Sequence, residues 1–237
     1  MYVFKRVLEQ WARASGPCRG CPLRGGDVVP YYAIGNWSSP IMFVGSNPGD
    51  ERPARSRRTF RQFHYDASIH ARVVREVFWN WADTRRRGTW GFASLFDQVL
   101  RPLGLTRRDI YYTNACKCAF GSNAPGKTDE ATRRCQKYLG WEIEAVKPKL
   151  IVTFGQEAAA SVRLRFGLVP EYGKCPRITE LHGSIEFHRG AQPVILHLLH
   201  WSNADRNMQG TRDRGSTYRA SVRGRIAMAF RAASLNR

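Results

Sequence analysis

The stretch Ile41-Met-Phe-Val-Gly-Ser-Asn-Pro-Gly-Asp50 joins a short apolar run to an abrupt polar turn. The first four residues are typical of a buried strand, and the glycines and proline that follow mark a tight turn. A strand that ends in such a turn often delivers its next side chains to a ligand. Asn47 stands in the turn where a phosphate-binding loop would present a lysine, so the stretch predicts a site with different ligand chemistry.

Apolar runs of the same kind recur on both sides of this stretch, at 31–35, 110–114, 150–154, 183–187 and 194–199. Segments with helical character lie between and around them, at 1–14, 66–83, 93–103, 129–146, 156–166 and 218–233. Strands that alternate with helices predict a three-layer α/β/α fold with a central, mostly parallel sheet of about four strands. We expect residues 1–237 to form a single domain that closes with a basic helix.

Charge is the strongest feature of the composition. The 237 residues include 38 Lys and Arg but only 19 Asp and Glu, a formal net charge of +19, and 43% of them are hydrophobic. This hydrophobic share is ample for a packed core. The excess of positive charge favours a polyanionic partner, because each phosphate that is neutralised releases condensed counterions. The alternative is a basic surface with no specific partner.

No apolar run approaches the roughly 20 residues of a membrane-spanning helix, and the N-terminus lacks the pattern of a secretory signal. We therefore expect an intracellular, cytoplasmic protein with no membrane partner. In that compartment, six cysteines indicate metal or redox chemistry more than disulfides. Cys18 and Cys21 form a C-x-x-C pair, Cys116, Cys118 and Cys135 lie far downstream, and Cys175 stands apart.

Ligands of parallel sheets bind beyond the carboxyl ends of the strands. This rule brings residues 45–50, 114–118, 155–156 and 200–203 to one edge. The edge has no phosphate-binding loop, dinucleotide fingerprint or G-x-S-x-G nucleophile turn. Its side chains can instead read the edge of a heterocycle or hold a water; they are Ser46, Asn47, Asp50, Asn114, His200 and Ser202. The alternative is that Asn47 and Asn114 only shape turns after strands.

Taken together, these segments resemble the uracil-DNA glycosylase superfamily, and most closely its iron–sulfur members, family 4. Gly45-Ser-Asn-Pro-Gly49 is similar to the first motif of the superfamily, and Tyr112-Thr-Asn-Ala-Cys-Lys-Cys118 to the strand-end segment of family 4. Pro148-Lys-Leu-Ile-Val-Thr-Phe-Gly155 resembles the third core strand of that family, and Leu198-Leu-His-Trp-Ser-Asn203 stands where a His-Pro-Ser motif is expected. Order and spacing agree over roughly residues 15–205.

The resemblance implies a DNA repair enzyme whose partner is DNA that contains a damaged base; we expect a nucleoid-associated monomer. The enzyme would flip uracil, the product of cytosine deamination, out of the stack and hydrolyse its N-glycosidic bond, leaving an abasic site. Two alternatives stay open. One is a glycosylase for another damaged base, such as hypoxanthine, or thymine or uracil opposite guanine. The other is a non-catalytic iron–sulfur DNA-binding protein.

The same resemblance implies a role for four of the cysteines. Family 4 enzymes hold a [4Fe–4S] cluster, and the matching positions here are Cys18, Cys21, Cys118 and Cys135. Four thiolates are what such a cluster needs. Zinc is the alternative, because four-cysteine sites with a C-x-x-C pair also suit it. The remaining two cysteines are expected to be ordinary thiols, although Cys116 is close enough to a ligand position to substitute.

The resemblance also assigns roles at the edge of the sheet. Asn47 would position the attacking water, with Asp50 as the alternative, and His200 would donate a hydrogen bond to O2 of the departing base. The residues expected to bind the base are Gly45, Ser46, Gly49, Asn114 and Ser202, with Phe60 stacked on it.

Two motifs depart from the family pattern. Family 4 usually has Glu and Ala where this chain has Ser46 and Asn47. Asn at the second of these places resembles thymine-DNA glycosylase and the single-strand-selective enzymes. The last motif reads His-Trp-Ser, without the usual proline. The first motif is therefore mixed, and it leaves the preferred base open.

Two arginine-rich segments are expected to contact DNA. Arg55, Arg57 and Arg58 precede Phe60 in segment 52–61, which is typical of a loop that contacts phosphates. Arg206 begins a second basic segment, in which Met208 is the candidate wedge that enters the duplex where the base has left. A solvated charged face is the alternative for the first segment.

Overall fold

A computed structural model describes residues 6–7, 9–10, 13–23, 33–47, 95–106, 108–118, 127–188, 193–201, 208, 211 and 217–235. The helix expected at 66–83 lies outside the described residues. Of the helix expected at 1–14, residues 6, 7, 9, 10, 13 and 14 are described; the first four are helical, whereas residues 13 and 14 form a turn, in which Ala14 has a φ of +51°.

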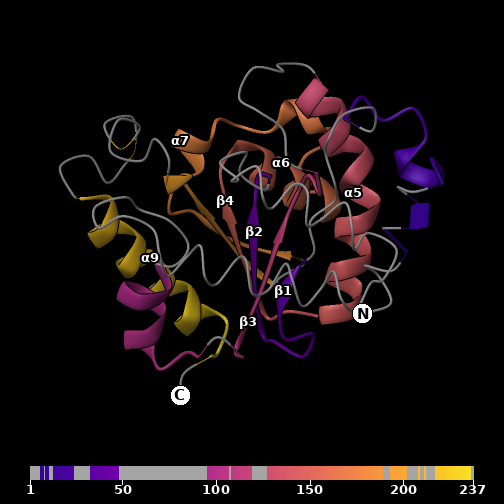
Figure 1. Ribbon diagram of the computed structural model, residues 1–237. Helices are drawn as coiled ribbons and strands as arrows, with labels where there is room; N and C mark the ends of the chain where they lie inside the picture. The colour runs from indigo at the N-terminus through magenta and orange to yellow at the C-terminus, as the bar shows by residue number, and fades with distance from the viewer. Residues whose placement is uncertain are drawn as a thin grey trace, which may run out of the picture.

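A six-stranded mixed sheet lies at the centre of the molecule (Figure 1). Its order is β1-β3-β2-β4-β6-β5, and the strands are β1 (Ile34–Gly35), β2 (Ile41–Gly45), β3 (Ile110–Asn114), β4 (Leu150–Phe154), β5 (Ile185–Phe187) and β6 (Val194–Leu198). The four central strands are mutually parallel, and the short edge strands β1 and β5 pair antiparallel. The predicted sheet of about four mostly parallel strands therefore corresponds to the four central strands, with one antiparallel strand added at each edge.

Helices pack on both faces of this sheet. The longer ones are α5 (Lys127–Val146), α6 (Gln156–Arg165) and α9 (Tyr218–Ala232), and the short ones are η1 (Gly16–Cys18), η2 (Phe96–Leu100), η3 (Arg101–Leu103), η4 (Tyr172–Lys174) and α7 (Ile178–Leu181). The ranges predicted for the three longer helices match within two residues. No helix among the described residues is both long and apolar enough to cross a membrane.

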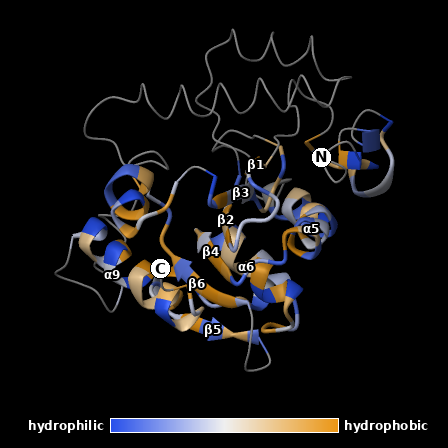
Figure 2. Cartoon of the chain, turned by 90° about the horizontal axis from the view of Figure 1, so that it is seen from below, coloured by the Kyte–Doolittle hydropathy of each residue, from blue (hydrophilic) through white to orange (hydrophobic). Residues whose placement is uncertain are grey.

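Alternate residues of β2 explain the three layers. Ile41 and Phe43 face a core that contains η2 and α9, whereas Met42 and Val44 face a core that contains α5 and α6. Successive side chains of a strand point to opposite faces, so a strand that is apolar throughout must be covered on both sides. Figure 2 shows the hydrophobic strands enclosed between these helical layers. The predicted α/β/α arrangement is confirmed.

Local signals fix the ends of the helices. The predicted segment 93–103 ends at Gly104, which has a φ of +78° and closes η3 in the left-handed conformation that glycine adopts without strain. Thr217 begins α9, because its side chain accepts a hydrogen bond from the backbone N–H of Ala220. Helix α9 contains four arginines and no acidic residue.

Candidate active site

The carboxyl ends of the four central strands meet at one edge of the sheet. Gly45 at the end of β2 pairs with Asn114 at the end of β3 on one side and with Phe154 at the end of β4 on the other. Phe154 in turn pairs with Leu198 at the end of β6. The four segments predicted to meet at this edge begin at residues 45, 114, 155 and 200. Their described parts therefore leave the sheet side by side. The sequence predicts this convergence correctly.

Gly45 leaves room for two polar side chains of β3. A Cβ atom at Gly45 would lie 2.5 Å from Oδ1 of Asn114 and 2.6 Å from the hydroxyl of Tyr112. These two groups are themselves joined, since the Tyr112 hydroxyl donates a hydrogen bond of 3.4 Å to Oδ1 of Asn114. Asn114 is 7% exposed. A larger residue at position 45 would displace the amide, which is why the edge of the sheet needs glycine there.

Ser46 is anchored to both neighbouring strands. Its hydroxyl donates to the carbonyl oxygen of Phe154 at 3.2 Å, and its own carbonyl oxygen accepts from the backbone N–H of Cys116 at 2.9 Å. Gly155, the residue after Phe154, has a φ of +93°. A Cβ atom at this position would lie 2.6 Å from the hydroxyl oxygen of Ser46. The turn that presents Asn47, which is partly buried, is thus fixed by hydrogen bonds at the preceding residue.

The segment that carries His200 is fixed through the backbone of Leu199. The N–H of Leu199 donates to Nδ1 of His182 at 3.0 Å, and its carbonyl oxygen accepts from the Tyr218 hydroxyl at 2.6 Å. Because Nδ1 of His182 accepts, its Nε2 carries the proton and donates to the Ser221 hydroxyl at 2.9 Å. Helix α9 and the turn after α7 therefore hold the start of the His200 segment from two sides.

Trp201 packs where the family motif usually has a proline. Its ring lies 5.0 Å from the ring of Phe154 and 4.5 Å from the imidazole of His200, measured between centroids. Phe154 also stacks on Phe43 of β2, at 6.2 Å. Aromatic packing on the core thus supports the turn after β6, and His200 lies against an apolar wall at the edge of the sheet.

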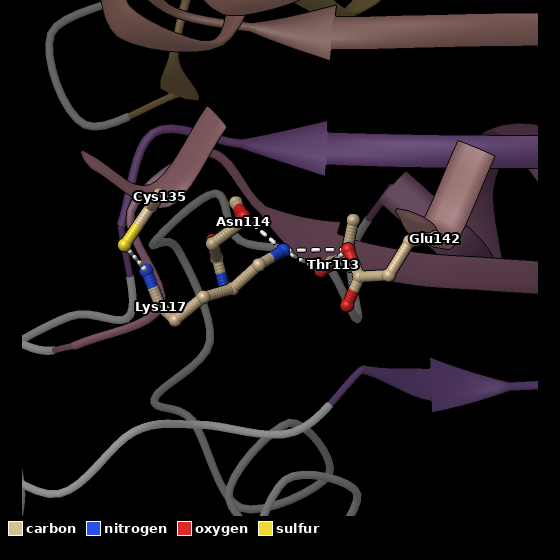
Figure 3. A network of polar contacts seen from close by, with 5 residues as sticks. All are labelled: Thr113, Asn114, Lys117, Cys135 and Glu142. Atoms are coloured by element: carbon tan, nitrogen blue, oxygen red, sulfur yellow. Dashed lines mark hydrogen bonds and ion pairs between the residues drawn. The ribbon is translucent and has the colours of Figure 1, made fainter. Parts of the chain in front are cut away.

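Lys117 and Glu142 form a buried ion pair beside Thr113 of β3 (Figure 3). Nζ of Lys117 donates to the carboxylate of Glu142 at 2.5 Å, to the hydroxyl of Thr113 at 2.8 Å and to the carbonyl oxygen of Asn114 at 2.7 Å. The side chains of Lys117 and Glu142 are only 3% and 6% exposed. All three ammonium hydrogens are therefore used, as burial of a charge requires. The network ties the backbone of Asn114 to α5.

Five cysteines gather at α5, to which one of them belongs. Cys18, Cys116, Cys118 and Cys135 share one buried cluster with Tyr138, and Cys21 packs against it. The four predicted ligands thus come together from the N-terminal segment, the loop after β3 and α5. Arg134 helps to join these segments, because its guanidinium donates to the carbonyl oxygen of Arg19 at 2.6 Å.

Two thiols of this cluster, those of Cys21 and Cys135, favour their protonated form. Burial raises the pKa of the Cys21 thiol, and a hydrogen bond with Cys116 together with burial raises the pKa of the Cys135 thiol. The backbone N–H of Lys117 points to Sγ of Cys135 at 3.5 Å. Within the part of the chain that the structure describes, no group of three or more His, Cys, Asp or Glu side chains is already arranged around a metal position.

Several predicted site residues lie outside the described residues: Gly49, Asp50, Arg55, Arg57, Arg58, Phe60, Ser202 and Arg206. Met208 is described, and it is 3% exposed within the core that contains η2 and α9. Its carbonyl oxygen accepts a hydrogen bond from the Thr211 hydroxyl at 2.8 Å. Met208 would have to leave this core to act as a wedge in DNA, because its side chain is covered by apolar neighbours.

Tyr112 and the pair of Lys117 and Glu142 are site features that were not predicted from the sequence. One signal for Tyr112 was present, since it precedes Asn114 by two residues in a strand and so faces the same side of the sheet. No signal joins Lys117 to Glu142, which is 25 residues away on α5.

These features define the class of protein: a three-layer α/β domain that presents asparagines and a histidine from strand ends along one edge of the sheet and that also contains a group of cysteines. The sequence profile of the uracil DNA glycosylase superfamily matches residues 32–221. The match covers most of the chain, and the chain belongs to this superfamily.

Its relatives include members of two types. The type-4 uracil-DNA glycosylase of Archaeoglobus fulgidus is 27% identical over 68% of this chain and 66% of its own length. That of Thermotoga maritima is 27% identical over 67% of each chain. The type-5 uracil-DNA glycosylase of Pyrobaculum aerophilum is 31% identical over 58% of this chain and 53% of its own length. The chain thus spans about half to two thirds of these relatives, and the resemblance to family 4 is confirmed.

Proposed function

We propose that the protein removes uracil from DNA by hydrolysing the N-glycosidic bond. The observation that carries this proposal is the placement of Asn114 and His200 and of the turn with Asn47 at the ends of β3, β6 and β2, along one edge of the sheet. The names of the relatives, type-4 and type-5 uracil-DNA glycosylases, support the same reaction. DNA is then the polyanionic partner that the net charge of +19 favours.

Three side chains have separate roles in this reaction. Cleavage of the bond develops positive charge on the sugar and negative charge on the departing base. Asn47 orients the attacking water with an amide, which avoids the cost of burying a carboxylate. His200 donates a hydrogen bond to O2 of uracil and stabilises the departing anion. Asn114 reads the opposite edge of the base, with an N–H for O4 and an oxygen for N3–H.

The gathered cysteines fit a [4Fe–4S] cluster held by Cys18, Cys21, Cys118 and Cys135. They supply four thiols in one place, three of them buried and Cys21 partly buried, and the N–H of Lys117 is available to a sulfur there. When bound, such a cluster supplies metal–thiolate bonds that cross-link the N-terminal segment, the loop after β3 and α5. Zinc held by the same four residues is the alternative.

Loss of one of these ligands should remove metal and stability together. We expect Cys118→Ser and Cys135→Ser to lower the iron content and to reduce the free energy of unfolding by several kcal/mol, because metal binding contributes to folding. Cys175→Ser is the matched control, since Cys175 is half-buried beside Arg163 and Glu186. Iron analysis and thermal melts of anaerobically purified protein measure both effects. A colourless wild type that contains zinc and no iron would contradict the iron–sulfur assignment.

An excision assay with a panel of bases tests the proposed function. Oligonucleotides that carry uracil, hypoxanthine or thymine opposite guanine are incubated with the protein and then cleaved with alkali at abasic sites. We expect uracil to be removed fastest. Faster removal of hypoxanthine or thymine would assign the site to that base, as the mixed first motif with Ser46 and Asn47 allows. Binding of the oligonucleotides without any cleavage would favour a non-catalytic DNA-binding protein.

A further inference from the structure

The hydrogen bond between Tyr112 and Asn114 orients an amide at the edge of the sheet. The Tyr112 hydroxyl donates to Oδ1 of Asn114 at 3.4 Å, and both side chains leave the same face of β3. Tyr112 is 8% exposed and belongs to the core that contains Phe43 and Phe154, so its ring is held by packing. Gly45 allows the contact, because a Cβ there would lie 2.5 Å from Oδ1 and 2.6 Å from the hydroxyl.

The hydroxyl keeps its proton in this place. Burial raises the pKa of Tyr112 well above its ordinary value, so the group remains a neutral phenol at neutral pH and can donate. The amide of Asn114 therefore directs its oxygen to Tyr112. The backbone of Asn114 is held separately, since its carbonyl oxygen accepts from Nζ of Lys117 at 2.7 Å. With the backbone fixed, the amide can change its orientation only by rotation about the side-chain bonds of Asn114, the last of which exchanges its oxygen and nitrogen.

This rotation decides which pyrimidine the amide can read. With its oxygen on the side of N3, Asn114 accepts from N3–H of uracil while its N–H donates to O4. Rotated by half a turn, the same amide would donate to the unprotonated N3 of cytosine and accept from its N4 amino group. It would also turn its nitrogen toward Tyr112, where the phenol oxygen can accept from the N–H, but the buried hydroxyl proton would lose Oδ1 of Asn114 as its acceptor. Tyr112 thus opposes the orientation that suits cytosine.

We propose that Tyr112 is a positioning residue that sets the base specificity of the site by fixing the orientation of the Asn114 amide. The proposal rests on the proposed uracil excision and adds a determinant of discrimination against cytosine, the undamaged base. An oriented amide is needed because cytosine is the far more abundant competitor in DNA, and a mismatched base is rejected only when buried polar groups are left unpaired.

Tyr112→Phe tests the proposal. Single-turnover excision is measured on matched oligonucleotides with uracil or cytosine at one position, with protein from a host that lacks its own uracil excision. We expect the uracil rate to fall about fivefold, as removal of one ordinary hydrogen bond implies, and slow cytosine excision to become detectable. The ratio of the two rates should fall by more than the uracil rate alone.

Tyr111→Phe is the matched control. It removes the same hydroxyl from the adjacent residue, whose ring packs against Trp37 and into the core on the α5 side of the sheet. This variant should leave the ratio of uracil to cytosine excision unchanged. Thermal melts of both variants show whether either is unfolded. An equal shift of the ratio in both variants would contradict the assignment to Tyr112.

A double-mutant cycle with Asn114→Ala separates positioning from a merely structural role. If Tyr112 acts through the amide, then Tyr112→Phe has no further effect on uracil excision once the amide is gone. The same loss in both backgrounds would overturn the proposal, as would an unchanged base ratio in Tyr112→Phe. If the wild type fails to remove uracil, the proposed function itself is wrong and this inference falls with it.

Discussion

Asn47→Ala is expected to lower single-turnover uracil excision by about 10²–10⁴-fold, the loss typical of a positioned catalytic group. The turn before Asn47 should survive the change, because Ser46 is held through its hydroxyl to Phe154 and through its carbonyl oxygen to Cys116. Binding of uracil-containing DNA should therefore remain close to wild type. Rapid-quench kinetics and a binding titration measure the two quantities separately.

An exposed asparagine provides the control for this change. Asn36 lies in the turn after β1, where its Oδ1 accepts from the N–H of Ser38 at 3.0 Å, and Asn36→Ala should leave the excision rate unchanged. If Asn47→Ala cuts at the wild-type rate, then Asn47 does not hold the water. The double variant with Asp50→Ala would in that case show whether Asp50 holds it.

Asn114→Asp is expected to abolish most uracil excision. A carboxylate removes the N–H that O4 of uracil needs and offers in its place an acceptor, which the N4 amino group of cytosine can use. Discrimination by such paired hydrogen bonds reaches about 10⁴–10⁵-fold in sites built to bind a specific polar edge. The Tyr112 hydroxyl can still donate to the new side chain, so the side chain should keep its place. Slow cytosine excision is the second expected result.

Single-turnover assays with uracil and cytosine oligonucleotides check both results. Asn36→Asp, the same chemical change at an exposed turn, should alter neither rate. Uracil excision by Asn114→Asp at the wild-type rate would show that Asn114 does not read the base. The proposed base pocket at the end of β3 would then be in the wrong place.

The apolar runs of the sequence were sufficient to predict most of the described fold. Runs such as 41–44, 110–112 and 150–154 have no polar alternation, so each must be covered on both faces, and parallel strands with helices on either side meet that need. Once the strands are parallel, their carboxyl ends must share an edge. Gly45, Asn114 and Phe154 are therefore neighbours in the structure, as the rule for parallel sheets predicts.

The side-chain contacts between distant elements could not be predicted in the same way. Local patterns in the sequence do not show that Glu142 on α5 meets Lys117, or that His182 receives the N–H of Leu199. Such contacts depend on how helices pack on the sheet. The burial of Met208 could not be predicted for the same reason. A methionine in an arginine-rich segment is expected to be exposed, and only the packing of the core shows that apolar neighbours cover it.

Quantification of the free base that the protein releases tests the central claim most directly. A duplex with one uracil opposite guanine is incubated with excess wild-type protein, and free uracil and abasic sites are measured in the same samples by mass spectrometry and alkaline cleavage. Hydrolysis of the N-glycosidic bond predicts that one free uracil appears for each abasic site, with one rate constant for both. An intact duplex after prolonged incubation with folded, metal-loaded protein would contradict the assignment of this site as a uracil-DNA glycosylase.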